Sequence, residues 1–132
     1  MRRGRKSSRG FTLIEMVIVI TLILILVSIA VPIYNRSITR AKEAVLRQDL
    51  FTLRQVISQY TLDKQKAPQS LEDVIGAGYL KVVPKDPMTG ESNWTTDQED
   101  SLMAVDQQEP GIVDVHSSSN QTASDGTAYS SW

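Results

Sequence analysis

Glu15 is a carboxylate at the edge of a long apolar segment. The next twenty residues, Met16 to Asn35, carry no charge, and a helix of that length spans the hydrocarbon core of a bilayer, about 30 Å. A carboxylate within that core costs about 2.5–3.5 kcal/mol, so an acid there needs a polar partner. Alternatively, Glu15 lies among the lipid headgroups, where the positive end of the helix dipole lowers the cost. The spacing leaves both interpretations open.

Oxygen ligands gather near the C-terminus. Four side chains that suit Ca²⁺ lie within twelve residues, namely Asp114, Ser117, Asn120 and Asp125. Residues 67–132 are few for an independent core, and a metal would supplement it because the chain has no Cys for a disulfide. However, the spacing matches no EF-hand loop, and Ser124-Asp125-Gly126 is equally consistent with a plain turn. A calcium site and a simple loop are therefore alternative expectations.

The residue inventory excludes several other kinds of site. With a single His, His116, and no Cys, we expect neither a catalytic triad nor a His-based zinc site, and we interpret His116 as a surface or packing residue. The sequence contains no phosphate-binding or dinucleotide-binding glycine pattern. We therefore expect a protein that is not an enzyme.

The elements that position these residues begin with one long helix. Apolar residues from position 34 to 60 recur at helical spacing, and this stripe comprises Tyr34, Ile38, Ala41, Val45, Leu46, Leu50, Leu53, Ile57 and Tyr60. The polar residues between them are expected only to face water, and they include Arg36, Arg40, Lys42, Glu43, Arg47, Gln48, Asp49, Arg54 and Gln55. Because only Pro32 interrupts the pattern, we predict one helix from Thr12 to about Asp63.

Residues 67–132 must cover that stripe. Ser70 and Asp73 have the spacing of a capping box, which predicts a short helix that ends at Gly76 or Gly78. Two strands are predicted at Trp94–Thr96 and Ile112–Val115, with a loop from Thr96 to Pro110 between them. Tyr129 and Trp132 are expected to pack back on the sheet. The predicted fold class is α+β, with a long N-terminal α-helix packed on a small C-terminal antiparallel β-sheet.

The first ten residues predict the orientation of the chain. Five of them are Arg or Lys, and positive charge before a first apolar segment favours a cytoplasmic N-terminus, with the chain after Asn35 on the far side. Residues 1–10 are therefore interpreted as a leader. A conventional secretory signal cleaved after Ser28-Ile29-Ala30 is the rival interpretation. It is disfavoured because the apolar segment is longer than the usual 7–15 residues and begins next to an acid.

The run Gly10-Phe11-Thr12-Leu13-Ile14-Glu15, after a short basic leader, resembles the class III signal of type IV pilins and type II secretion pseudopilins. The resemblance implies that a prepilin peptidase cleaves after Gly10 and methylates the new N-terminal residue, Phe11. It also implies that Glu15 pairs with the N-terminal amine of a neighbouring subunit during filament assembly. The family commonly has a Pro near the position of Pro32, where the helix loosens in filaments.

A second segment points to the same family. The order S-L-E-D-V-I…G-Y-L…V-P-K-D-P-M-T-G from Ser70 to Gly90 looks like the segment that joins helix to sheet in the major pseudopilins of type II secretion. The lack of Cys adds weight, since many type IVa major pilins close a C-terminal loop with a disulfide. The resemblance further implies a calcium ion in the C-terminal loop, with Ser117 and Asp125 at the positions of two ligands.

These observations divide the chain into a leader (1–10), a transmembrane and polymerisation segment (11–35), an amphipathic half-helix (36–66) and a small periplasmic α+β domain (67–132). Without the leader, nine basic residues remain against fifteen acidic ones, which argues against a nucleic-acid partner.

The family resemblance implies a self-assembling pseudopilus subunit at the inner membrane, whose other partners are minor pseudopilins, the prepilin peptidase, the assembly platform and the lipid bilayer. A type IV pilin, or less readily a membrane-anchored ligand-binding protein, is the alternative.

Overall fold

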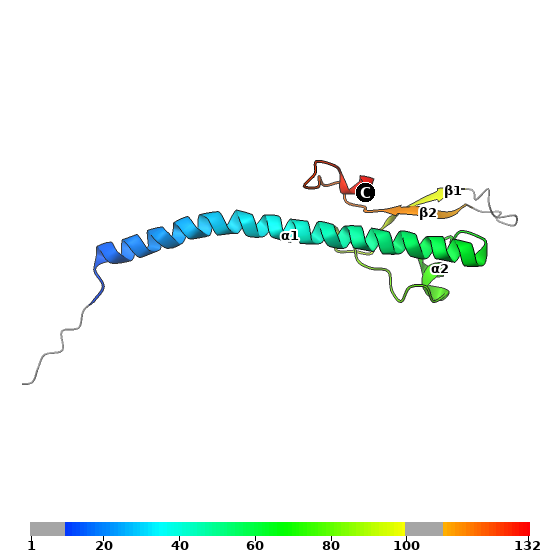
Figure 1. Cartoon of the computed structure of the whole chain (residues 1–132), viewed down its shortest axis with the longest axis horizontal. Helices are drawn as coiled ribbons and strands as arrows, with labels where there is room; N and C mark the ends of the chain where they lie inside the picture. The colour runs from blue at the N-terminus through cyan, green and yellow to red at the C-terminus, as the bar shows by residue number, and fades with distance from the viewer. Residues whose placement is uncertain (1–9, 100–109) are drawn as a thin grey trace, which may run out of the picture. The chain divides into compact units, whose positions relative to one another are not determined.

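The computed structural model describes residues 10–99 and 110–132. Most of the leader, residues 1–9, lies outside the described residues, as does most of the predicted loop before Pro110. The chain divides into two units, Met1–Ile38 and Thr39–Trp132. Helix α1, Leu13–Lys64, belongs partly to each (Figure 1). Its bounds confirm the predicted helix to within one residue at each end.

The described part of the first unit is the N-terminal half of α1 and the three residues before it. Thr12 precedes the helix, and its Oγ1 accepts a hydrogen bond from the Glu15 N–H at 3.3 Å. The hydroxyls of Thr21 and Ser28 donate to carbonyls one turn earlier in the helix, so their polar atoms are satisfied without water. The helix also continues through Pro32.

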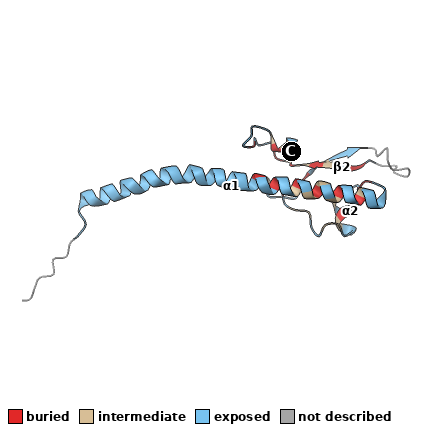
Figure 2. Cartoon of the chain, viewed as in Figure 1, coloured by how far each residue is buried: buried red, intermediate tan, exposed pale blue. Residues whose placement is uncertain are grey.

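Every side chain of α1 before Glu43 is exposed (Figure 2). Among the described residues, α1 is the one helix long and apolar enough to cross a membrane. The prediction that residues 67–132 cover the whole stripe was wrong at its start. Four of its residues are exposed, namely Tyr34, Ile38, Ala41 and Val45. Periodicity marks an apolar face but does not distinguish a face covered within the chain from one that another molecule or lipid covers.

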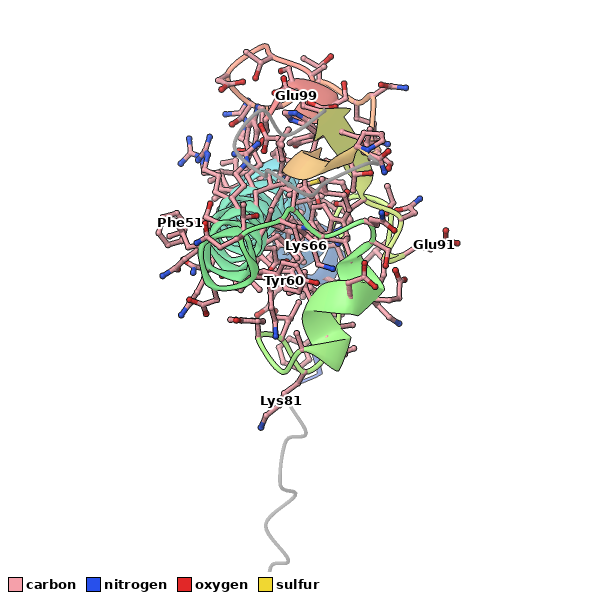
Figure 3. The ribbon with its side chains drawn as sticks, turned by 90° about the vertical axis from the view of Figure 1, so that its right-hand side faces the viewer. Phe51, Tyr60, Lys66, Lys81, Glu91 and Glu99 are labelled. Atoms are coloured by element: carbon pink, nitrogen blue, oxygen red, sulfur yellow. The ribbon has the colours of Figure 1, made fainter. Side chains whose placement is uncertain are left out.

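The core of the second unit contains the rest of the stripe. Four leucine and isoleucine side chains of α1 pack with residues of the strands and the C-terminal segment, and this core consists of Leu46, Leu50, Leu53, Ile57, Trp94, Ile112, Val115, Ala123 and Tyr129. The predicted docking of the two C-terminal aromatics is confirmed, because Tyr129 is buried and Trp132 packs against the core. Phe51 lies on the other side of α1 and projects into solvent (Figure 3).

Helix α2, Leu71–Gly76, has the predicted capping box. The Ser70 hydroxyl accepts a hydrogen bond from the Asp73 N–H, and the Asp73 carboxylate accepts one from the Ser70 N–H. The helix ends at Gly76, as predicted, and Gly78 follows with a φ of 87°, a conformation that side chains other than Gly rarely adopt.

Two antiparallel strands form the sheet, β1 at Thr95–Glu99 and β2 at Gly111–His116. Both strands were predicted, but β1 begins one residue later than predicted and continues through residues 97–99, which the sequence assigns to a loop. The reason for the error is that β1 is polar and almost wholly exposed, so it lacks the alternation of a half-buried strand. A short 3₁₀ helix, Tyr129–Ser131, closes the chain. The predicted α+β class with a small antiparallel sheet is confirmed.

Candidate functional site

The predicted processing site lies just before α1. Gly10 and Phe11 precede the first helical residue, Leu13, and both are exposed, Phe11 by 78%. Both residues lie outside regular structure, and no described neighbour lies within 4 Å of the position that a Cβ of Gly10 would occupy. Exposed, irregular segments are the preferred sites of proteolysis. The geometry therefore suits cleavage between Gly10 and Phe11.

Glu15 lies in the first turn of α1. Its main-chain N–H is capped by Thr12, but among the described residues no cation or hydrogen-bond donor contacts its carboxylate. The helix dipole favours a negative charge in this turn. The carboxylate is thus placed at a favourable helix end and is free to accept a partner from outside the described chain.

Glu43 is the residue that joins α1 to the C-terminal segment. It is 3% exposed and accepts hydrogen bonds from the Ser124 N–H at 2.8 Å, the Ser124 hydroxyl at 2.6 Å and the Tyr129 hydroxyl at 2.9 Å. The hydrogen bonds from Ser124 outweigh burial and lower the pKa of Glu43, whereas burial and the nearby carboxylate raise the pKa of Tyr129. The prediction that Glu43 faces water was wrong.

A signal for Glu43 was present in the sequence. The buried positions of α1 run 43, 46, 50, 53, 57 and 60, alternating steps of three and four, so Glu43 lies one step before Leu46 on the same stripe. An acid on an apolar stripe is expected to have partners when buried. The identity of those partners, about eighty residues away, could not be read from local sequence.

Arg54 is the second polar residue of α1 that was wrongly assigned to solvent. Its Nε donates to the Asp114 carboxylate at 2.6 Å, and its terminal nitrogen donates to the main-chain oxygens of Val115 and Trp132. Partial burial raises the pKa of Asp114, but hydrogen bonds from Arg54 and the Val115 N–H outweigh burial, and the pKa is lowered. Arg54 therefore fixes the end of β2 and the C-terminal residue against α1.

The four predicted calcium ligands have different surroundings. Asp114 pairs with Arg54, and Ser117 is buried and donates its hydroxyl to Asp86. Asn120 and Asp125 are exposed, and Asp125 accepts hydrogen bonds from the main chain and hydroxyl of Thr127, which lower its pKa. Among the described residues, no hydrogen bond or ion pair joins the four to one another. Of these groups, exposed Asn120 and Asp125 fit a calcium site better than Asp114, which faces a guanidinium.

Asp86 is a buried acid that the sequence did not single out. Its carboxylate accepts hydrogen bonds from the Met88 N–H at 2.8 Å and from the Ser117 hydroxyl. Its main-chain N–H donates to the Glu91 carbonyl at 2.9 Å. Asp86 thus closes the turn after Pro84 and ties it to the start of the C-terminal loop.

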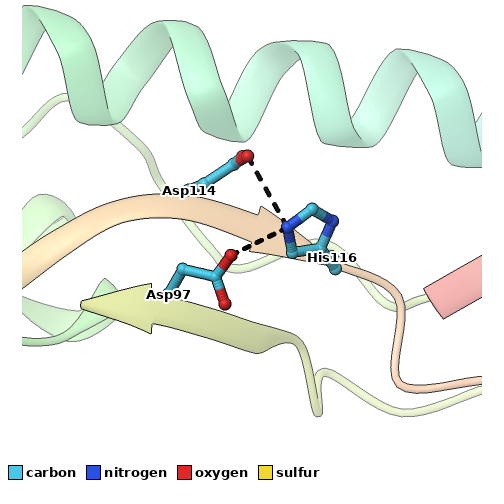
Figure 4. A group of neighbouring side chains, drawn as sticks. All are labelled: Asp97, Asp114 and His116. Carbon is cyan, nitrogen blue, oxygen red and sulfur yellow. Dashed lines mark hydrogen bonds and ion pairs between the residues drawn. The ribbon is translucent and has the colours of Figure 1, made fainter. Parts of the chain in front are cut away.

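His116 is half-buried at the end of β2 and lies beside two carboxylates (Figure 4). Its Nε2 is 3.0 Å from Oδ2 of Asp97 and 3.6 Å from Oδ2 of Asp114. Its Nδ1 is 3.0 Å from the main-chain oxygen of Trp132. A His-based zinc site was not expected from the sequence because the chain has no Cys and no second His. In the sheet, however, the carboxylates of Asp97 and Asp114 lie beside His116.

Comparison with known proteins adds to this geometry. Residues 5–31 match the family model described as "Prokaryotic N-terminal methylation motif". Type II secretion system core protein G of Klebsiella michiganensis is 30% identical to this chain over 103 residues, which cover 66% of this chain and 72% of the relative. The chain belongs to the type II secretion system core protein G family. The predicted resemblance to type II secretion pseudopilins is thereby confirmed.

Other members of the core protein G family agree. The Escherichia coli K12 protein is 31% identical over 101 residues, covering 64% of this chain and 70% of the relative. The Vibrio cholerae protein is 30% identical over 102 residues, covering 66% and 69%. No solved structure gives a significant match. The match to the methylation motif includes Gly10, Phe11 and Glu15, which are the predicted processing and assembly residues.

Proposed function

We propose that this protein is a structural subunit of the pseudopilus and supports type II protein secretion. The observation that carries the proposal is the methylation motif at residues 5–31, followed directly by an exposed apolar helix, in a member of the core protein G family. In this role the protein performs no catalysis, and its work is mechanical. Subunits added side by side through their N-terminal helices lengthen a filament.

The exposed half of α1 requires cover from lipid or from other subunits. Moving an apolar helix from lipid into a filament exchanges one apolar environment for another, so the hydrophobic effect contributes little to this step. A polar pair contributes more, because Glu15 has no cationic partner among the described residues and an unpaired charge in hydrocarbon is costly. The N-terminal amine of Phe11 from a neighbouring subunit would supply that partner and fix the register of the two helices.

The proposal also assigns a location and partners. Basic residues before the apolar segment favour a cytoplasmic leader. In this proposal the protein is anchored in the inner membrane and its second unit lies in the periplasm. Processing requires a prepilin peptidase, and assembly requires the inner-membrane platform and minor pseudopilins. Phe51, which is 63% exposed on α1, is available for contact with a neighbouring subunit.

We also propose that the C-terminal loop, residues 117–126, binds calcium. Exposed Asn120 and Asp125, buried Ser117 and nearby carbonyls provide oxygen ligands of the kind Ca²⁺ prefers. Asp114 lies in β2, before the loop. It would contribute only if its carboxylate bound the ion while it also accepted the hydrogen bond from Arg54. The ion would stabilise a small domain that has no disulfide.

A substitution at Glu15 tests the filament role. In cells that carry a complete secretion system, we expect Glu15→Ala to be inserted and cleaved normally but to be incorporated into filaments poorly, because the incoming amine loses its partner. Ile14→Ala is the matched control, since Ile14 is an exposed neighbour in the same helical turn and carries no charge. Filament yield from Glu15→Ala equal to that of Ile14→Ala would contradict the proposed pairing.

A further inference from the structure

We propose that Asp97, Asp114 and His116 form a binding site for a divalent transition metal, with Zn²⁺ as the best-suited ion. The site lies on the sheet of the second unit and uses none of the residues of the methylation motif. Of the predicted calcium ligands it includes Asp114 but none of Ser117, Asn120 and Asp125. The inference therefore does not depend on the filament role.

The strand register brings the three side chains together. Asp97 of β1 lies directly opposite Asp114 of β2, and His116 is two residues further along β2. Residues opposite one another, and residues two apart along a strand, share one face of a sheet. The cluster is thus specified by the backbone pairing of two strands and not by a chance approach of long side chains.

The distances fit a tetrahedral ion. One donor atom from each residue lies within 4.8 Å of the others. Two ligands on a tetrahedral zinc, each about 2.0–2.1 Å from the metal, lie about 3.3 Å apart. Nε2 of His116 is 3.0 Å from the Asp97 oxygen and 3.6 Å from the Asp114 oxygen. One distance is slightly shorter and the other slightly longer than the value expected for zinc ligands. Three protein ligands would leave the fourth position to water.

The hydrogen bond at the other ring nitrogen supports a cation at Nε2. The Trp132 main-chain oxygen can only accept, so the contact at 3.0 Å requires a proton on Nδ1 of His116. In the neutral ring, Nε2 then presents a lone pair to two carboxylate oxygens, which are also acceptors. Either a second proton or a metal must lie among these three atoms. Histidine ligands of metals commonly donate their other N–H to a main-chain oxygen in this way.

Arg54 leaves one oxygen of Asp114 available. The Nε of Arg54 donates a hydrogen bond to Oδ1 of Asp114. The other oxygen of Asp114, Oδ2, faces His116 (Figure 4). One imidazole and two carboxylates suit Zn²⁺, whereas Ca²⁺ takes six to eight oxygen ligands. The ligand types therefore distinguish this site from the calcium loop.

The test is a Zn²⁺ titration of the full chain in detergent micelles, followed by nitrogen NMR of the imidazole. His116 is the only His in the chain, so its ring signals are unambiguous. We expect saturable binding of one Zn²⁺, a shift of the Nε2 signal and a retained proton on Nδ1. Asp97→Asn should weaken binding at least tenfold, and because Asp97 is exposed this variant is expected to fold.

Two control variants make the result specific. Glu99→Gln removes the same charge from the same strand without touching the cluster, and Asp125→Asn removes a ligand of the calcium loop. Both should bind Zn²⁺ as the unaltered chain does. The inference is overturned if Nε2 shows no saturable response and remains protonated beside Asp97, or if Asp97→Asn binds Zn²⁺ as tightly as Glu99→Gln does.

Discussion

Replacing Glu43 with Gln should destabilise the second unit strongly. The buried carboxylate accepts three hydrogen bonds from Ser124 and Tyr129. Glutamine can keep the bonds from the Ser124 N–H and the Tyr129 hydroxyl on its one oxygen, and its amide can donate to the Ser124 hydroxyl if that hydroxyl turns to accept. All three bonds then lose the charge of the acceptor. Since a hydrogen bond to a charged group contributes about 1.5–3 kcal/mol and a neutral one about 0.5–1.5 kcal/mol, we expect Glu43→Gln to lower the free energy of unfolding by about 2–4 kcal/mol.

Urea unfolding followed by tryptophan fluorescence measures this change. Both Trp residues of the chain, Trp94 and Trp132, belong to the second unit, so their emission reports its unfolding even in the full chain in micelles. Glu91→Gln is the control, because the Glu91 side chain is exposed. That variant should change stability by less than about 0.5 kcal/mol.

The pH dependence gives a second check on the same residue. The pKa of Glu43 is lowered below its ordinary value of 4.5 in the folded chain, so its stabilising contribution is complete above about pH 4.5. The contribution is lost as the pH falls through the lowered folded value. The difference between the unaltered chain and Glu43→Gln should therefore narrow in acid. A loss below about 0.5 kcal/mol at pH 7, or a difference that is constant down to low pH, would refute the reasoning.

Two further substitutions probe the cap of α2 and the calcium loop. Ser70→Ala removes the hydroxyl that caps α2 and should cost about 1 kcal/mol in urea unfolding; no measurable loss would show that the cap is redundant. Calcium should raise the thermal midpoint of the second unit relative to chelator, and Asp125→Ala should abolish that rise while Asp63→Ala, outside the loop, should not. If the thermal midpoint of the unaltered chain is the same with calcium as with chelator, the proposed calcium site is wrong.

Local sequence was sufficient where one element determines its own structure. The capping box at Ser70 and Asp73 predicted α2. A long apolar segment, followed by an amphipathic stripe without Gly, predicted α1. The leucines from Leu46 onward were recognised as core because their spacing follows the helical period. These features depend on neighbours within a few residues.

Long-range partners account for the errors. Glu43 and Arg54 are bound by groups near the C-terminus, and Asp97 meets His116 only through strand pairing. Nothing in the local sequence specifies such partners. The exposed start of the stripe, including Tyr34 and Ile38, was misassigned because apolar periodicity does not identify the molecule that covers it. Strand β1 was partly missed because an exposed polar strand has no apolar alternation.

The mature N-terminus tests the central claim most directly. Protein isolated from the membranes of cells that contain a prepilin peptidase should be analysed by intact-mass and N-terminal fragment mass spectrometry. The pseudopilin account predicts a chain that begins at Phe11 and carries one methyl group on its N-terminal amine. A chain that begins at Val31, as after cleavage by a signal peptidase, would have lost Glu15 and the apolar helix and would contradict the account.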